Sequence, residues 1–140
     1  MNSIVLDTNV LVAGVRSRNG ASYELLSRIG GAEFRVCVSV PLVLEYESIL
    51  LRQIDELALS AGDIEGLVNY VVTVAHHQEV FFLWRPQLRD PKDDMVLELA
   101  VAAQCNWIVT HNVRDFAATS QFGIGVATPQ QYLRTLRDQS

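Results

Sequence analysis

Residues 3–11 read SIVLDTNVL, so a short run of apolar, strand-forming residues leads directly into an acid, a hydroxyl and an amide. The run 3–6 predicts a buried β-strand, and a helical pattern follows from Asn9 to about Val15. Asp7 stands between the two elements. An aspartate there either caps the next helix through its side chain or delivers a functional carboxylate to the end of a strand, and local evidence leaves both interpretations open.

The same succession of a short strand and a helix recurs along the chain. Such alternation predicts an α/β fold with a largely parallel sheet, because parallel neighbours are joined by helical crossovers. No Pro/Gly/Ser-rich linker divides the 140 residues, so we expect one domain over 1–140. The predicted strands cover 3–6, 34–38, 80–84 and 107–110, and the predicted helices cover 9–15, 21–29, a segment from about 39, 60–75, 91–103 and a segment from 128. Two of these helix starts carry capping patterns, Ser60 with Asp63 and Thr128 with Gln131.

Composition limits the classes of protein to which the chain can belong. The 49% hydrophobic and 19% charged content are typical of a globular protein with a buried core. The formal net charge of −5 argues against a broad basic nucleic-acid face but leaves room for a local site. No apolar stretch is long enough to span a bilayer, so we expect a cytoplasmic protein with no membrane contact. Cys37 and Cys105 match no metal-binding spacing and are expected to pack in the core.

Polar side chains follow several predicted strands at the point where each strand ends. In a parallel sheet these carboxyl ends meet at one edge, and ligands bind in the crevice beyond them. The helix at 91–103 joins this edge if its first turn opens toward it. The residues concerned are Asp7 after the first strand, Ser39 and Glu45 after the second, Asp93 in the first turn of the 91–103 helix, and Thr110, His111, Asn112 and Asp115 after the 107–110 strand.

Each acid also has an interpretation that needs no ligand. Asp93 lies beside the buried stripe of its helix, whereas Asp94 is expected to be solvated, but the same turn could form a capping motif with Asp90. Glu45 lies at the edge of the apolar side of its helix, yet it could be an ordinary surface acid. Asp115 could close a local turn through backbone hydrogen bonds.

The acids point to a cation when they are considered together. Four carboxylates at one edge would repel each other, which raises their pKa values or requires a bound cation. Oxygen ligands select Mg²⁺ or Mn²⁺ over zinc and copper, and Mg²⁺ binds through one or two carboxylates with waters and substrate phosphates. A phosphodiester is therefore the natural substrate, because a bound metal can activate water for in-line attack. The three histidines show no ligand spacing and are assigned to no metal.

The motifs resemble those of PIN-domain ribonucleases over essentially the whole chain. The resemblance implies a PIN-like three-layer α/β/α fold with a mainly parallel central sheet, and RNA cleavage supported by Mg²⁺ or Mn²⁺. Many members are VapC-like toxins, each neutralised by an antitoxin protein, and they usually form homodimers. The matching segments are LDTNVL (6–11), SVPLVLEYESIL (39–50), DPKDDMVLELAVAA (90–103), WIVTHNVRDF (107–116) and VATPQQYL (126–133).

The resemblance also implies roles for individual residues. Asp7, Glu45 and Asp93 match the catalytic, metal-binding acids of the family. Many members carry a further aspartate where this chain has Asn112, while in others Asn occupies that place and the acid of the DF pair, here Asp115, supplies the charge. Whether Asp115 or Asn112 fills the fourth position, and whether one or two metals bind, stays open. The residues expected to support the acids through polar contacts are Asn9, Ser39, Thr110 and Asn112.

Basic residues are expected to supply the RNA contacts. Ten of the eleven are arginines, whose planar guanidinium suits bidentate phosphate contacts better than the lysine ammonium. The alternative is that each is an ordinary solvated charge. The arginines expected to border the acidic cleft and bind the RNA backbone are Arg16, Arg85, Arg89 and Arg114.

Three functions compete for the same sequence. The full acidic set favours a metal-dependent endoribonuclease, the toxin half of a toxin–antitoxin pair. Asn112 keeps open a catalytically inactive PIN-like module that binds RNA or protein. An aspartyl-phosphate enzyme or receiver domain also places an aspartate after its first strand, but Asn9 stands where such phosphatases need a second aspartate, and the one lysine is Lys92.

Overall fold

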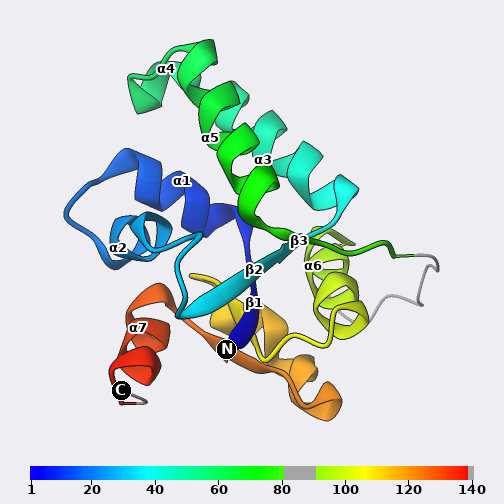
Figure 1. Cartoon of the computed structure of the whole chain (residues 1–140). Coiled ribbons are helices and arrows are strands. Elements are labelled where there is room, and N and C mark those ends of the chain that lie inside the picture. Colours follow the sequence, from blue (N-terminus) through cyan, green and yellow to red (C-terminus); the bar gives the residue numbers. More distant parts are fainter. Residues whose placement is uncertain (81–90, 139–140) are drawn as a thin grey trace.

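The computed structural model describes residues 1–80 and 91–138, in which short strands alternate with helices (Figure 1). Apart from the differences given below, the predicted elements are present with ends shifted by at most two residues. The elements in chain order are β1 (Asn2–Leu6), α1 (Thr8–Arg16), α2 (Ala21–Ser27), β2 (Phe34–Val38), α3 (Val40–Arg52), α4 (Ile54–Leu57), α5 (Ala61–Val74), β3 (His76–His77), α6 (Pro91–Ala102), β4 (Trp107–Val109), the 3₁₀-helix η1 (Val113–Phe122), β5 (Gly125–Ala127) and α7 (Pro129–Asp138).

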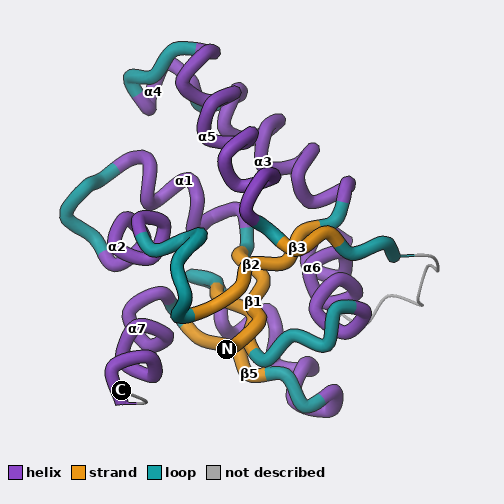
Figure 2. The backbone as a smooth tube through the Cα atoms, viewed as in Figure 1, coloured by secondary structure: helices purple, strands orange, loops and turns teal. Residues whose placement is uncertain are grey.

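The described strands form one sheet with the order β3-β2-β1-β4-β5, and every pair is parallel. β1 lies in the middle, in register with β2 at Ile4 and Val36 and with β4 at Ile4 and Trp107. In Figures 1 and 2, α1, α2 and α7 lie on one side of the sheet and α6 on the other. The predicted three-layer α/β/α fold with a mainly parallel central sheet is therefore confirmed.

β1 lies at the centre of the core because both faces of the sheet are covered. Ile4, Val5 and Leu6 have no exposed surface, which explains why this strand is a continuous apolar run rather than an alternating one. Each fully buried aliphatic side chain contributes roughly 1.5–3 kcal/mol. Cys37 and Cys105 belong to the same core, as predicted.

Helices α3 and α5 project beyond the sheet toward the short helix α4 (Figure 1). A second, smaller cluster of buried apolar side chains joins this projection to α1. Its buried members are Val12, Leu50, Leu57, Ile64 and Val68. The cluster packs α1 against α3 and α5.

Two helix starts show reciprocal capping at positions that the sequence marks. At the start of α5, the Ser60 hydroxyl accepts from the Asp63 N–H at 3.0 Å, and the Asp63 carboxylate accepts from the Ser60 N–H at 3.0 Å. At the start of α7, Thr128 and Gln131 exchange equivalent bonds of 2.9 and 3.1 Å. Both starts satisfy backbone donors that a helix end otherwise leaves unpaired.

The predicted strand at 80–84 is wrong where the structure describes it. The third strand is β3 at His76–His77, because the chain reaches the sheet edge directly after α5 and pairs there with Cys37 and Val38 of β2. Val80 lies outside any strand, and residues 81–84 lie outside the described part of the chain.

Two elements in the last third of the chain, η1 and β5, have no counterpart in the prediction. β5 is three residues long and begins with glycine, which is a poor strand former. A Cβ atom at Gly125 would lie 2.6 Å from the Trp107 ring of the neighbouring strand, so the tertiary packing requires a glycine that local propensity disfavours.

None of the helices in the described residues is long and apolar enough to cross a membrane.

Candidate active site

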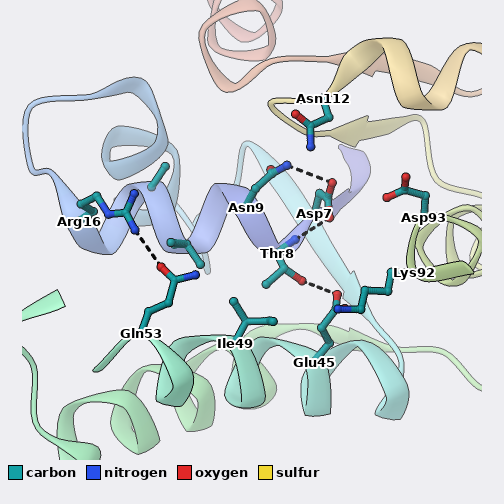
Figure 3. Close-up of a pocket in the computed structure, with 12 residues that line it drawn as sticks. Asp7, Thr8, Asn9, Arg16, Glu45, Ile49, Gln53, Lys92, Asp93 and Asn112 are labelled. Carbon is teal, nitrogen blue, oxygen red and sulfur yellow. Dashed lines mark hydrogen bonds and ion pairs between the residues drawn. The ribbon is translucent and has the colours of Figure 1, made fainter. Parts of the chain in front are cut away.

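A pocket of about 360 Å³ opens at the carboxyl end of β1, between α1, α3 and the first turn of α6 (Figure 3). Its acidic end holds three of the predicted acids. The described residues that line the whole pocket are Asp7, Thr8, Asn9, Val12, Ala13, Arg16, Glu45, Ile49, Gln53, Lys92, Asp93 and Asn112. The structure therefore brings together side chains from four separate parts of the sequence.

Asp7 is positioned by both of the elements that it joins. Its N–H continues the β1–β4 hydrogen-bonding pattern by donating to the Val109 carbonyl at 2.9 Å. Its Oδ1 accepts from the Thr8 N–H at 2.8 Å and so caps α1. Its Oδ2 accepts from the Thr110 hydroxyl at 2.8 Å and from the Asn9 amide at 3.3 Å. The two sequence interpretations are compatible, because the same carboxylate caps the helix and lines the pocket.

The Asp7 carboxyl lies in an environment that disfavours its charge. Only 8% of the residue is exposed. Burial raises the pKa of Asp7 above its ordinary value, hydrogen bonds from Thr110 and Thr8 lower it in part, and the negative charges of Glu45 and Asp115 raise it further. A cation bound in the pocket would favour the ionised carboxylate.

Glu45 faces Asp7 from α3. Its Oε2 accepts from the Thr8 hydroxyl at 2.7 Å, and its Oε1 lies 3.8 Å from the Lys92 ammonium. Next to it, the buried Tyr46 hydroxyl donates to the Leu6 carbonyl at 2.5 Å, which joins α3 to the end of β1. Burial first, and then the negative charges of Asp7 and Glu45, raise the pKa of Tyr46 well above its ordinary value. Tyr46 therefore stays a neutral hydrogen-bond donor beneath the acidic end.

The two consecutive aspartates of α6, Asp93 and Asp94, differ in position, because only one of them lines the pocket. Asp93 is half-buried and lines the pocket, as predicted. Asp94 is 8% exposed, so the expectation that it is solvated is wrong. The physical reason is that α6 contacts β1, β2, β4, α3 and η1, which covers more of its circumference than one apolar stripe suggests.

Side chains from the loop after β4 complete the acidic end. The Thr110 hydroxyl is fully buried and, besides donating to Asp7, accepts from the Asn112 N–H at 3.0 Å. Asn9 Oδ1 accepts from the His111 N–H at 3.2 Å. The Asn112 side chain lines the pocket near Asn9 (Figure 3). Three of the four predicted supporting residues, Asn9, Thr110 and Asn112, therefore lie at this end.

The remaining predicted site residues do not all lie in this pocket. Ser39 caps α3 by accepting from the Leu42 N–H at 3.3 Å and lines a different pocket beside β3. Asp115 is exposed in the first turn of η1 and is not among the residues that line the acidic pocket. Its negative charge is one of the effects that raise the pKa of Asp7. Arg16 lines the pocket, whereas Arg114 is exposed on η1. Arg85 and Arg89 lie outside the described residues.

Two polar pocket residues, Thr8 and Gln53, were missed by the sequence reasoning. Thr8 directly follows Asp7, and its place in the first turn of the capped helix was the available signal. Gln53 directly follows α3, and no local pattern connects it with Arg16, which donates to it at 2.8 Å.

The oxygen donors at the acidic end suit a hydrated hard cation. In the described ranges, no three His, Cys, Asp or Glu side chains lie close enough to hold a metal ion together. Mg²⁺ keeps several waters and needs only one or two carboxylates, so direct ligation by all three acids is not required. Carboxylate and amide oxygens without thiolate or imidazole are the donors that Mg²⁺ and Mn²⁺ prefer.

Comparisons with known proteins agree with this fold. A PIN domain family model matches residues 3–114. The fold is similar to a chain in the crystal structure of VapBC2 from Rickettsia felis bound to a DNA fragment from their promoter (TM-score 0.61, 12% identity, 89% of this chain and 98% of that chain covered). It is also similar to a chain of VapBC-1 from nontypeable Haemophilus influenzae (TM-score 0.61, 12% identity, 91% and 98% covered). No curated protein matches the sequence. Because the family match covers most of its length, the chain belongs to the PIN domain family.

Proposed function

We propose that this PIN domain is a Mg²⁺- or Mn²⁺-dependent endoribonuclease. The observation that carries the proposal is the meeting of Asp7, Glu45 and Asp93, from three separate segments, in one pocket. Three acids in one pocket repel each other, and the buried Asp7 carboxyl already resists ionisation. A divalent cation offsets both effects, and membership of the PIN family supports its use in nuclease chemistry.

Asp7, Glu45 and Asp93 would hold the cation, directly or through its waters. When bound, the ion supplies the activation of a water and the stabilisation of charge on a phosphodiester. The chain's own contribution is orientation. Thr8 and Thr110 hold the two oxygens of Asp7, and the Thr8 hydroxyl also holds Glu45. Carboxylates fixed in this way lose little conformational freedom when the substrate arrives.

We assign the fourth acidic role to Asp115, acting from outside the pocket wall. Asn112 lines the pocket, but its amide carries no charge. The negative charge of Asp115 reaches Asp7 and raises the pKa of that carboxyl. Asp115→Asn is therefore expected to weaken Mn²⁺ binding less than Asp7→Asn does, as measured by calorimetry. Equal losses would place Asp115 among the direct ligands.

We further propose that arginines bind the RNA backbone beside the acids. Arg16 lines the pocket and the exposed Arg114 lies on η1, where a guanidinium can contact phosphates. The predicted contacts of Arg85 and Arg89 belong to the same proposal. RNA binding that weakens steeply with salt, and weakens further when these arginines are neutralised, is the expected result.

The proposed biological role is that of a toxin, acting as a homodimer and neutralised by an antitoxin protein. Support comes from the fold that this chain shares with chains of two VapBC structures. Induced expression of the wild-type chain is expected to arrest bacterial growth, and Glu45→Gln is expected to abolish the arrest. Sedimentation that detects only monomer at high protein concentration would contradict the homodimer.

The nuclease proposal is tested by two substitutions on one helix. Glu45→Gln removes a charge from the pocket, while Glu47→Gln removes the same charge from the exposed side of α3. With end-labelled structured and unstructured RNAs and Mn²⁺, we expect Glu47→Gln to cleave like wild type and Glu45→Gln to lose cleavage. Equal cleavage by the two variants would overturn the proposed site.

Asn112 supports a second candidate, a PIN module that binds RNA or protein without cutting it. An amide in the pocket wall leaves one anion fewer to hold a metal. The same assay separates the two functions. Metal-independent RNA binding with no cleavage, even in Mn²⁺, would favour the binding module.

A further inference from the structure

The pocket extends well beyond its acidic end. Helices α1 and α3 run side by side and are joined by two hydrogen bonds between their side chains (Figure 3). Thr8 donates to Glu45 at 2.7 Å at the acidic end, and Arg16 donates to Gln53 at 2.8 Å at the other end. The second pair lies eight residues further along both helices, about 12 Å at the helical rise. We call the space between the two pairs the α1–α3 groove.

The walls of the α1–α3 groove change character along its length. Val12, Ala13 and Ile49 line its middle, between the acids and the Arg16–Gln53 pair. A nucleotide has the same succession of chemistries, because a charged phosphate is followed by a flat base with polar edges. Pockets of this volume, about 360 Å³, are of the size that holds small ligands.

We infer that the α1–α3 groove is a base-specific subsite that binds the guanine adjacent to the scissile phosphate. The inference rests on the proposed function, since the phosphate is placed at the acidic end. The base would lie against the apolar middle of the groove, and its edge would meet Arg16 and Gln53. These two residues would then determine where the RNA is cut.

The choice of guanine follows from donor chemistry. Arginine can only donate hydrogen bonds, so the Gln53 atom that it contacts is the amide oxygen. The Gln53 amide nitrogen and the other Arg16 N–H groups are therefore the groups with donor capacity at this end. Guanine presents two adjacent acceptors, O6 and N7, whereas adenine presents a donor beside N7. An adenine in the groove would set its N6–H₂ donor against the Arg16 N–H groups, and the Gln53 amide oxygen that could accept from it already accepts from Arg16.

The Arg16–Gln53 pair contributes little to folding, which allows it to be tested. Arg16 is 54% exposed, and its ion pair with Glu56, at 3.7 Å, joins two exposed side chains. Such surface pairs add little to the free energy of unfolding. Arg16→Ala and Gln53→Ala are therefore expected to fold, and their thermal unfolding midpoints check this directly.

The test uses oligouridine RNAs that carry a single central guanine or a single central adenine. We expect wild type with Mn²⁺ to cleave beside guanine at least about 5-fold faster than beside adenine. Arg16→Ala and Gln53→Ala should bring the ratio close to one. Arg18→Ala, which removes the same charge just beyond α1, should keep the wild-type ratio. Fluorescence anisotropy with the same RNAs in EDTA measures the base preference in binding without cleavage.

The outcomes separate the subsite from the proposed function. Guanine-selective binding without any cleavage would support the subsite and contradict the nuclease. Mn²⁺-dependent cleavage with no base preference in either assay would overturn the subsite and leave the nuclease intact. An equal loss for both RNAs in Arg16→Ala, with the ratio unchanged, would leave Arg16 with only the backbone contact of the proposed function and would overturn base reading. An unchanged ratio in both variants, combined with lost capture of a co-expressed antitoxin, would assign the groove to a protein partner and overturn the inference.

Discussion

The first turns of α1 and α5 are both capped with the help of an aspartate, yet the two ends differ in what the charge does. At α1, Asp7 is the N-cap itself, is buried, and has a pKa raised chiefly by burial. At α5, Asp63 occupies the third helical position, is exposed, and has a pKa lowered by hydrogen bonds from Ser60. The capping hydrogen bonds favour the ionised carboxylate at both helix ends, but at α1 the burial of Asp7 outweighs them.

The difference identifies which aspartate does more than cap. A serine at position 7 could also cap α1 without burying a charge. An acid whose ionised form is disfavoured by its surroundings is a candidate functional group, because the site that shifts its pKa is built by other residues. Asp63 has no such surroundings, and its capping box explains it fully.

The largest expected effect is on catalysis. Asp7→Asn keeps a capping side chain but removes the charge from the pocket, and should lower Mn²⁺-dependent RNA cleavage by about 100-fold or more. Asp63→Asn should cleave like wild type. Rates are compared under single-turnover conditions. Comparable rates for the two variants would erase the functional distinction between the two helix ends.

The next effect concerns stability in the presence of metal. Mn²⁺ at 100 times its dissociation constant should raise the free energy of unfolding of wild type by about 2.7 kcal/mol. Asp63→Asn should gain the same amount, and Asp7→Asn much less. Urea unfolding with Mn²⁺ and with EDTA measures the gain. A full gain in Asp7→Asn would show that the cation binds without Asp7.

A smaller effect tests the buried support beneath the α1 end. Tyr46→Phe removes the donor to the buried Leu6 carbonyl and should cost roughly 1–2 kcal/mol of stability. Tyr70→Phe removes a bond to the Ile29 carbonyl, but Tyr70 is half exposed and water can replace its hydroxyl. Urea unfolding of both variants makes the comparison, and a larger loss in Tyr70→Phe would contradict it.

The smallest effect is on the free energy of unfolding of the metal-free protein, measured by urea unfolding in EDTA. The two variants are expected to change it in opposite directions. The folded pKa of Asp7 is above its unfolded value, so the stability it contributes is present below the unfolded pKa and is lost as the pH rises through the folded pKa. Asp7→Asn should therefore stabilise the metal-free protein at neutral pH. The folded pKa of Asp63 is lowered, so its contribution is present above the unfolded pKa and is lost as the pH falls through the folded pKa. Asp63→Asn should destabilise slightly, and equal signs for both would contradict the comparison.

Local sequence patterns placed each of the three pocket acids within its own element. Helical periodicity places Asp93 and Glu45 beside the buried sides of their helices, and the end of an apolar run places Asp7 at a strand terminus. The carboxyl ends of parallel strands share one edge, so these positions could be predicted to converge. Both capping patterns, at Ser60 and at Thr128, are equally local and were predicted on the same basis.

The positions that the sequence could not resolve depend on contacts between distant elements. The burial of Asp94 follows from the number of elements around α6. The presence of Asn112 in the pocket wall, with Asp115 outside it, follows from the course of the chain into η1.

By itself, then, the sequence determined the α/β pattern, the helix starts, and the strand end and helix sides on which Asp7, Glu45 and Asp93 lie, because periodicity and capping depend on residues within a turn or two of each other. Only the tertiary structure decided that Thr8 and Glu45, and likewise Arg16 and Gln53, meet between α1 and α3. Those pairs are separated by 37 residues. Their contact depends on how the two helices pack against a common cluster, and no short-range pattern encodes that packing.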